Sequence, residues 1–318
     1  TFSIGVPGVF LALAPEAESL LGTYGSAREV RRRRKRTAAI VVGGPLTVSP
    51  EHVDFRIFDT MVTGEGEYAV RQLLVDFPRI RRVYRGGRVR ELDGLPFPAR
   101  ELVSGSLGGR VFTGDEEHEQ GGSSVLTTSR GCPFDCVYCA SPGIWGRKIV
   151  YRSPTSVLSE VDEVIRRHGV RQFRLSDDNL TTDRHRVEVL CEYLSRRDIV
   201  WRASIRVWPN DPRMFAALKR GGCAEVSFGV QSGDQDVLNA LRKKTTVRMN
   251  KDAIHNAKAQ GLAVRVLFMI GTPGETQDTV DRNIEFFEEV KDDCDAIAVT
   301  NFVPLPGCEV ARAPEKCG

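Results

Sequence analysis

The sequence predicts an α/β protein in which an incomplete doubly wound domain precedes an open, partial (β/α)6 barrel. Two observations carry this prediction. Strand-like apolar runs alternate with helical stretches along the 318 residues, and this alternation implies parallel sheets covered by helices. Six strand–helix units without an internal sequence repeat follow residue 124, whereas the segment before residue 78 offers only three strands. Three strands are about half of a usual doubly wound sheet.

Each strand of the predicted barrel is followed by a helix. The strands are expected near residues 125–128, 172–176, 201–206, 225–229, 264–269 and 296–300. The helices are expected near residues 154–168, 184–196, 211–221, 234–242, 249–260 and 276–290. Ser153 and Pro154 mark one helix start, because Ser is a good N-cap and Pro is tolerated at the first helical position. Functional groups of such a barrel gather at the carboxyl ends of its strands.

The segment before the barrel shows a change in composition near residue 79. Strands are expected at residues 2–6, 38–42 and 60–62, and helices over about 15–34 and 67–77. We therefore divide the chain into an incomplete Rossmann-like domain (1–78), a linker rich in Gly, Arg and Pro with a hairpin around Gly86-Gly87 (79–122), the barrel (123–307) and the start of a C-terminal extension (308–318).

Composition and charge describe an ordinary globular chain, with 41% hydrophobic and 27% charged residues. The net charge of +3 is too small to indicate a nucleic-acid partner. No run of 18 apolar residues occurs, so we expect no membrane span. The apolar stretch 4–14 is short, contains Pro7 and lacks a basic leader, which argues against a signal peptide. We expect a cytoplasmic protein, and its start at Thr1 suggests further residues upstream.

Three of the eight cysteines, Cys132, Cys136 and Cys139, fall within eight residues directly after the first barrel strand. In a cytosolic protein such spacing indicates a metal site. Three thiolates can hold three irons of a cubane iron–sulfur cluster and leave the fourth iron open to a small molecule. The alternative is a structural zinc site or three buried thiols, but no fourth Cys or His lies close in the sequence.

This CxxxCxxC spacing, with the aromatic Tyr138 before the last cysteine, resembles the radical S-adenosylmethionine (SAM) superfamily over about residues 123–307. The resemblance implies a partial barrel of radical SAM type, a [4Fe–4S] cluster and SAM bound at the open iron, with Tyr138 beside the cofactor. It also implies an external one-electron donor of the flavodoxin or ferredoxin type. Cleavage of SAM would give methionine and a 5′-deoxyadenosyl radical, which removes a hydrogen atom from a substrate.

The resemblance extends to two further strand ends. Ser176, Asp177 and Asp178 end the second strand, where the family binds the methionine amino end or the substrate, so the two aspartates are our candidate catalytic residues. The alternative is an N-cap for the next helix. Arg206 ends the third strand and would pair with the methionine carboxylate, or else form an ordinary ion pair.

Two more strand ends carry expected cofactor contacts. Gln231 and Ser232 end the fourth strand, where the family often has Glu-Ser near the ribose or amino group. Gln231 retains hydrogen-bonding capacity but carries one less negative charge, which puts its role in doubt. Ile270 and Gly271 end the fifth strand, in the segment that the family places near the adenine, where Gly permits close approach of the backbone.

Residues 41–45 and 62–67 are spaced as in the subgroup of the superfamily that carries a cobalamin-binding domain before the barrel. The Asp-x-His-x-x-Gly loop of that domain is absent, and His52 and His118 are not in its context. Either the first strands lie outside this chain, or the domain is reduced and binds no cobalamin. Cobalamin therefore stays possible without support from a histidine loop, and we favour direct radical chemistry.

The leading hypothesis is hydrogen abstraction from a sugar, aminoglycoside or nucleoside-like small molecule in antibiotic or other natural-product biosynthesis. Dehydration, rearrangement, epimerisation or oxidation would follow. One alternative is a cobalamin-dependent radical SAM C-methyltransferase. Another is an RNA-modifying radical SAM enzyme, but only the basic run 31–36 favours RNA, and such a run is more often a solvated helix end. A cluster-bearing sensor or electron-transfer protein is a third alternative, which a cofactor-binding barrel disfavours.

The remaining cysteines and two tryptophans have weaker patterns. Cys191 and Cys223 are expected to be small core residues. Cys308 and Cys317 lie near the end of the chain and could join an auxiliary cluster. Trp145 and Trp208 could wall the active site, although core packing is the commoner use of such residues.

Overall fold

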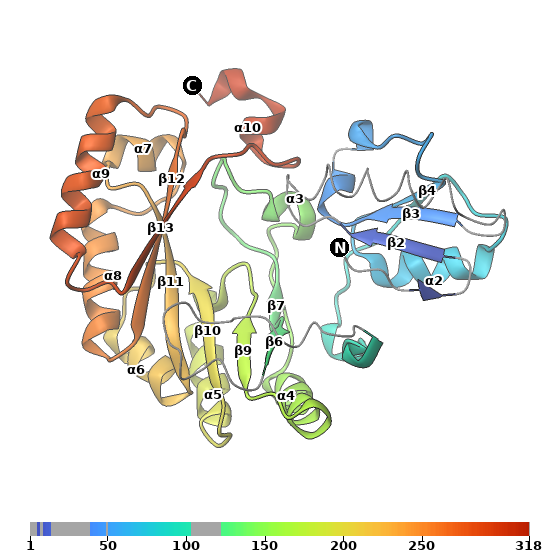
Figure 1. The fold of residues 1–318 in the computed structure, drawn as a ribbon, viewed down its shortest axis with the longest axis horizontal. Helices are drawn as coiled ribbons and strands as arrows, with labels where there is room; N and C mark the ends of the chain where they lie inside the picture. The colour runs from blue at the N-terminus through green and yellow to red at the C-terminus, as the bar shows by residue number, and fades with distance from the viewer. Residues whose placement is uncertain (1–4, 7–8, 14–38, 49, 103–121, 318) are drawn as a thin grey trace. The chain divides into compact units, whose positions relative to one another are not determined.

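The computed structural model describes residues 5–6, 9–13, 39–48, 50–102 and 122–317 (Figure 1). The chain divides into two compact units, each of which is described by itself. The first unit comprises Thr1–Arg90, Val137–Lys148 and Val303–Lys316, and the second comprises Glu91–Cys136, Ile149–Phe302 and Cys317–Gly318. The basic run 31–36, the predicted helix over 15–34 and His118 lie outside the described residues.

The second unit is built on a parallel sheet of six strands in the order β13-β12-β11-β10-β9-β6. The strands are β6 (Ser123–Leu126), β9 (Gln172–Leu175), β10 (Val200–Ile205), β11 (Cys223–Gln231), β12 (Ala263–Ile270) and β13 (Ala296–Asn301). All six predicted strands are present, and the sheet order confirms the partial (β/α)6 barrel. A short antiparallel pair, β7 (Ser129–Arg130) with β8 (Val150–Tyr151), flanks the cysteine loop and was not predicted.

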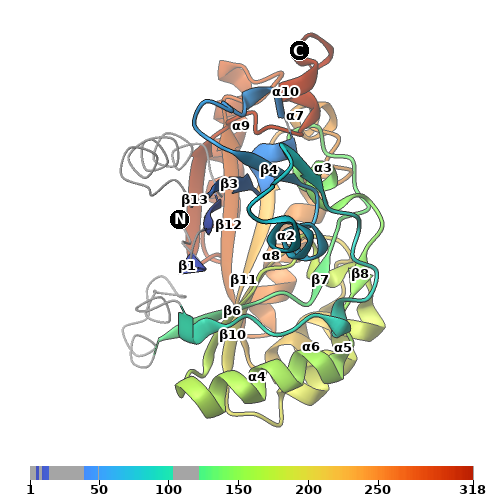
Figure 2. The same cartoon turned by 90° about the vertical axis from the view of Figure 1, so that its right-hand side faces the viewer.

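Helices cover one face of this sheet. They are α4 (Pro154–His168), α5 (Arg184–Leu194), α6 (Pro212–Arg220), α7 (Gln235–Ala240), α8 (Val247–Ala259) and α9 (Gln277–Val290). Figure 1 shows them along the outer side of the strands, and Figure 2 shows α4, α5 and α6 near one another on that side. All six predicted helices are confirmed. Their starts follow from side-chain caps: Ser153, for example, accepts the N–H of Ser156, and Asp183 that of Arg186.

The core of the second unit lies between the sheet and these helices. Alternate strand residues point toward the helices, and Phe173, Trp201, Phe228 and Phe268 are at most 1% exposed there. Full burial of each such side chain contributes roughly 1.5–3 kcal/mol. The other face of the same strands carries polar and charged residues, so the sheet separates an apolar layer from a polar inner face.

The first unit contains a five-stranded sheet in the order β1-β2-β3-β4-β5. The strands are β1 (Gly5–Val6), β2 (Val9–Leu13), β3 (Ala39–Gly43), β4 (Thr60–Thr63) and β5 (Val83–Arg85). Strands β1 and β2 pair antiparallel, and the others pair parallel, as a partial doubly wound domain requires. The predicted hairpin around Gly86 is wrong: β5 pairs parallel with β4, and the Gly86 N–H donates to the Thr63 carbonyl at 2.7 Å.

Short helices complete the two units. The first unit has α2 (Gly66–Asp76), α3 (Ser141–Trp145), α10 (Glu309–Arg312) and the 3-10 turns Pro45–Val48, Pro50–His52 and Pro314–Lys316. The second has the 3-10 turns Leu92–Gly94, Arg100–Leu102 and Leu180–Thr182. Helix α2 packs Ala69 and Leu73 against Val41 and Val62 of the sheet. None of the described helices has both the length and the apolar character to span a membrane.

Candidate active site

The cysteine loop begins directly after β6 and β7. Cys132 and Cys136 belong to the second unit, whereas Tyr138 and Cys139 lie in the segment Val137–Lys148 that is assigned to the first. Cys136 is 8% exposed, the other two cysteines are half-buried, and none of the three is in a disulfide. Cys132 and Cys136 therefore follow the carboxyl end of the first barrel strand, where a barrel enzyme places its site.

The Arg206 side chain contacts residues of the cysteine loop. Its Nη1 is 3.4 Å from the Sγ of Cys136, and its guanidinium carbon lies 3.8 Å from the ring centre of Phe134. Another guanidinium nitrogen donates to the carbonyl of Lys243. The Arg206 side chain is buried, and its Nε has no hydrogen-bond partner among the described residues.

Asp177 and Asp178 accept hydrogen bonds from residues 128–131, which include β7 and lead into the cysteine loop. The Asp177 carboxylate accepts hydrogen bonds from the N–H and hydroxyl of Thr128 at 2.6 and 2.5 Å and from the hydroxyl of Ser129 at 2.7 Å. Asp178 accepts the N–H of Gly131 at 2.9 Å. Burial raises the pKa of Asp177, and the hydrogen bonds from Thr128 and Ser129 oppose that shift.

Ser176 directly follows β9 and precedes the two aspartates. Its backbone N–H donates to the Leu126 carbonyl at 2.8 Å, and its side chain is exposed. Of the three predicted residues at this strand end, Ser176 thus has the side chain most accessible to a ligand. The two aspartates instead fix the backbone that carries Cys132.

Gln231 sits at a bulge of β11 with a φ of 69°. A Cβ added at Gly229 would lie 3.0 Å from the Gln231 Oε1 and 3.3 Å from the Lys243 Nζ, so both side chains lie over Gly229. Lys243 is only 4% exposed. Lys243 was not among the site residues predicted from the sequence, because the basic run 242–244 has the pattern of an ordinary solvated turn.

The other predicted cofactor contacts differ in their surroundings. Ser232 is 1% exposed, and its hydroxyl donates to the Asn283 Oδ1 of α9 at 2.9 Å. Ile270 is 38% exposed at the end of β12, and the Gly271 N–H donates to the Glu275 carboxylate at 3.0 Å. Gly271 has a φ of 76°, which explains the glycine there.

The remaining cysteines and tryptophans have clear positions. Cys191 and Cys223 are at most 2% exposed, which confirms them as core residues. Cys308 is the N-cap of α10, and its Sγ accepts the N–H of Ala311 at 3.3 Å. Trp208 is 52% exposed, so core packing was the wrong expectation for it.

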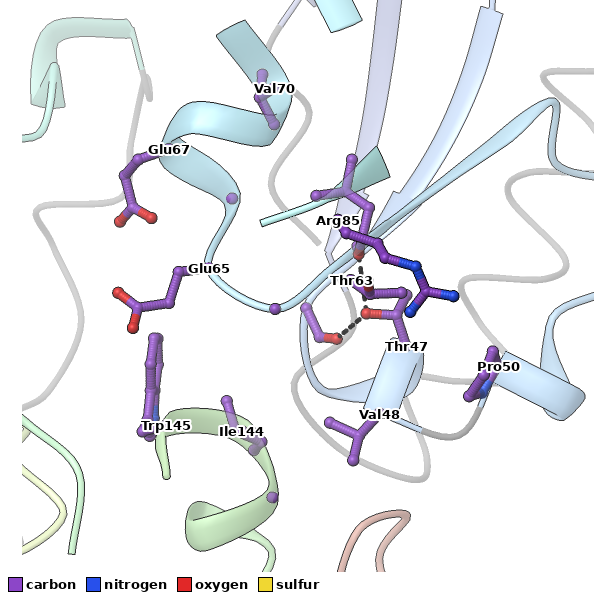
Figure 3. Close-up of a pocket in the computed structure, with 16 residues that line it drawn as sticks. Thr47, Val48, Pro50, Thr63, Glu65, Glu67, Val70, Arg85, Ile144 and Trp145 are labelled. Carbon is purple, nitrogen blue, oxygen red and sulfur yellow. Dashed lines mark hydrogen bonds between the residues drawn. The ribbon is translucent and has the colours of Figure 1, made fainter. Parts of the chain in front are cut away.

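The first unit contains a pocket of about 590 Å³ at the carboxyl ends of β3 and β4. Trp145 and Ile144 of α3 form one side, and Thr47, Val48 and Arg85 lie on another (Figure 3). The Thr47 hydroxyl lies 2.8 and 2.9 Å from the carbonyls of Gly44 and Val62, which fixes the turn after β3.

Glycines give this pocket its shape. A Cβ on Gly64 would lie 2.5 Å from the carbonyl oxygen of Gly86, and a Cβ on Gly86 would lie 1.7 Å from that of Glu65. The carboxylate of Glu65 is buried and pairs with Arg88 at 2.7 Å. Helix α2 starts beside this turn without a side-chain cap. Gly64 and the first residues of α2 therefore line the pocket together with Trp145.

Comparison with known proteins identifies the protein family of this chain. The model of the family described as Radical SAM superfamily matches residues 126–287, just over half of the chain. The chain belongs to the radical SAM superfamily of enzymes.

Two curated relatives are similar in sequence to more than half of this chain. An uncharacterized methyltransferase of Pyrococcus horikoshii is 29% identical over 292 residues, covering 84% of this chain and 61% of the relative. The cytidylyl-2-hydroxyethylphosphonate methyltransferase of Streptomyces wedmorensis is 28% identical over 209 residues, covering 63% of this chain and 39% of the relative. The chain thus spans less than two thirds of the length of either relative.

Two solved structures share the fold of most of the chain. The radical SAM methyltransferase TsrM from Kitasatospora setae, solved with cobalamin and a [4Fe–4S] cluster, matches with a TM-score of 0.74 at 18% identity, covering 97% of this chain and 65% of TsrM. The cobalamin-dependent SAM radical enzyme OxsB matches with a TM-score of 0.70 at 19% identity, covering 89% of this chain and 44% of OxsB. The incomplete first unit thus has the fold of the cobalamin-binding-like domain.

The residues present fit the iron–sulfur cluster that membership of the radical SAM superfamily implies. Three thiols outside disulfides, one of them beside the Arg206 guanidinium, are a suitable donor set for an iron–sulfur cluster. Within the described ranges, no three His, Cys, Asp or Glu side chains are grouped closely enough to hold a metal ion by themselves. The pocket in the first unit has the size and apolar lining typical of sites for organic cofactors.

Proposed function

We propose that this chain is the catalytic part of a corrinoid-dependent radical SAM methyltransferase acting on a small molecule. This is the first alternative of the sequence analysis, and it replaces hydrogen abstraction from a sugar-like substrate as the leading hypothesis. The observation that carries it is the glycine-lined pocket beside Trp145 at the carboxyl ends of β3 and β4. The names of the relatives, methyltransferases in both curated cases above, support the same reaction class.

In this proposal Cys132, Cys136 and Cys139 would hold a [4Fe–4S] cluster, and the pocket of the first unit would hold part of a corrinoid. The cluster would supply the electron that cleaves SAM, and the corrinoid a cobalt able to carry a methyl group.

The chain's own residues have three tasks in this proposal. Asp177 and Asp178 fix the backbone on either side of β7 so that the cysteines keep their positions. Arg206 offers a charged N–H to the Cys136 thiolate. The buried cation of Lys243 and the amide of Gln231, which lie together over Gly229, would receive the carboxylate and amino ends of SAM.

Tyr138, Ser176, Ser232, Ile270 and Gly271 keep their proposed roles as neighbours of SAM. The exposed Ser176 and Ile270 are the stronger candidates for direct contact, because the Ser232 hydroxyl is occupied by Asn283. The external electron donor, the cytoplasmic location and a place in antibiotic biosynthesis remain predictions from the sequence.

The test is corrinoid retention together with methyl transfer. The protein is reconstituted without oxygen in the presence of iron, sulfide and hydroxocobalamin, and gel filtration removes free corrinoid. We expect a retained corrinoid spectrum in the wild type and a loss of at least tenfold in affinity for Trp145→Ala, because truncation removes a wall of the pocket. The matched control is Trp208→Ala, whose side chain is exposed outside the pocket.

Turnover is followed with methyl-deuterated SAM and a chemical reductant, using extracts of small molecules as methyl acceptors. Incorporation of the labelled methyl group into a product, dependent on added corrinoid, is the expected result. If 5′-deoxyadenosine forms equally with and without corrinoid and no label is transferred, the hydrogen-abstraction hypothesis replaces this proposal.

A further inference from the structure

The inner face of the second-unit sheet carries three arginines side by side, away from the cysteine loop. Arg202 of β10 is in register with Arg174 on β9 and with Glu225 on β11, and Arg265 of β12 is opposite Ser227. All three arginines, with Ser204 and Ser227 among others, line a cavity of about 160 Å³. Paired positions of parallel strands point to the same face, so these side chains gather there by register.

The positive charge of this cavity exceeds the negative charge that faces it. One oxygen of the buried Glu225 lies 3.3 Å from the Nη1 of Arg202 and also 3.3 Å from the Nε of Arg265. Arg174 is exposed and forms no salt bridge with any residue of the described ranges. One carboxylate therefore pairs with two of the three guanidinium groups.

Some guanidinium N–H groups of this cavity also make no hydrogen bond within the described residues. The Nε of Arg202 and the Nη2 of Arg265 are buried and have no hydrogen-bond partner in the described part of the chain. A buried donor without a partner costs free energy, more so when it is charged. Burial lowers the pKa of Arg202, Glu225 opposes that shift, and the neighbouring charges of Arg174 and Arg265 add to it. Each of these costs falls if an anion enters the cavity.

We propose that this cavity is an anion-binding subsite, formed by Arg174, Arg202 and Arg265, for the phosphate, phosphonate or carboxylate group of the substrate. Binding of the anion stands on the cavity alone, and its assignment to a methyl acceptor rests on the proposed function. Arg202 lies on β10, and Arg206 directly follows this strand four residues later, about 13 Å away at 3.3 Å per extended residue. The substrate would thus be long enough to place its anionic end that far from the cluster loop.

The first experiment measures binding of inorganic phosphate to the cluster-loaded protein by isothermal titration calorimetry at constant ionic strength, with acetate in a parallel titration. We expect saturable phosphate binding that Arg202→Gln and Arg265→Gln each weaken about tenfold or more, as for loss of a charge-assisted hydrogen bond. Arg171→Gln is the matched control, since it removes the same charge from an exposed arginine that pairs with Asp198. Tighter binding of acetate than of phosphate would assign a carboxylate substrate.

Glu225→Gln gives the sharper result. If an anion competes with Glu225 for the arginines, removal of this carboxylate tightens phosphate binding several-fold. If the arginines serve only to neutralise Glu225, the variant leaves phosphate binding unchanged and melts at a lower temperature, and the proposal fails. It fails equally if the wild type binds no phosphate, or if Arg171→Gln loses as much affinity as Arg202→Gln. No SAM, corrinoid or reductant is present, so this outcome is independent of whether methyl transfer occurs.

Discussion

The Nη1 of Arg206 lies 3.4 Å from the Sγ of Cys136, although the two residues are 70 positions apart in the sequence. The contact joins the carboxyl end of β10 to the cysteine loop. A charged donor on a cluster thiolate offsets the negative charge of the cluster, and hydrogen bonds to sulfur are one of the ways a protein sets a cluster potential. The residue predicted to bind the SAM carboxylate thus contacts Cys136, a proposed cluster ligand.

Replacement of Arg206 should therefore change the redox behaviour of the cluster. The positive charge stabilises the reduced, more negative state, so Arg206→Gln should lower the midpoint potential by on the order of tens of mV. A given electron donor would then reduce a smaller fraction of the cluster. Redox titration followed by electron paramagnetic resonance measures the shift. Arg213→Gln, at a side chain that is 82% exposed, is the control. An unchanged potential in Arg206→Gln would show that the contact has no electronic role.

The three loop cysteines should be needed for iron retention and the other cysteines should not. Cys136→Ser is expected to lose most of the bound iron and sulfide, because one of three ligands is removed. Cys294→Ser, a half-buried thiol near the end of α9, should keep the wild-type iron content. Iron and sulfide analysis with the visible absorption spectrum measures both. Full iron content and SAM cleavage in Cys136→Ser would refute the ligand assignment.

Asp177 should contribute to stability as well as to the position of the loop. In Asp177→Asn the amide group faces the Thr128 and Ser129 donors, so at least one charge-assisted hydrogen bond is lost. We expect a decrease of about 2–3 kcal/mol in the free energy of unfolding, measured by urea denaturation, and a lower cluster content. The exposed Asp236→Asn on α7 should change stability by less than about 0.5 kcal/mol. Equal stability of the two variants would exclude this role of Asp177.

Cysteine reactivity should separate core thiols from loop thiols. Burial raises the pKa of Cys191 to about 12, and burial also raises the pKa of Cys223 well above its usual value. Since the thiolate is the nucleophile, both should resist iodoacetamide at pH 8 in the folded protein and react fully after denaturation. Mass spectrometry of the alkylated peptides measures this. Rapid alkylation of Cys191 in the native, cluster-free protein would contradict its assignment to the core.

The barrel could be predicted from the sequence because its signals are local. Each long barrel helix has a side-chain cap, such as Ser153 or Thr276. The barrel strands carry apolar residues at alternate positions, as β9 and β10 show. The first unit was predicted less completely. Strand β5 has three residues, only one of them buried, so neither its length nor its pattern separates it from a hairpin. Helices α3 and α10 have five and four residues, too few for a helical period.

The residues of the candidate site could be predicted where their chemistry depends on spacing along the sequence. They could not be predicted where it depends on contacts between distant segments. The three cysteines are visible in the sequence, because a cluster needs ligands on one short loop. The bonds of Asp177 to Thr128, and of Ser232 to Asn283, join residues 49 and 51 positions apart, and no local pattern reveals such partners. Lys243 was missed for the same reason, since its burial follows from the path of the chain around it.

The bond between Thr128 and Asp177 also bears on the order in which the enzyme matures. Strands β6 and β9 pair across 49 residues, and closing a loop of that length has an entropic cost that must be met before the pairing is stable. Until β9 joins β6, the hydrogen bonds from residues 128–131 to Asp177 and Asp178 cannot form, and the backbone before Cys132 lacks that support. Insertion of iron and sulfide should therefore come late, after the parallel sheet has formed, and the scaffold proteins that deliver a cluster would meet a largely folded barrel instead of a nascent chain.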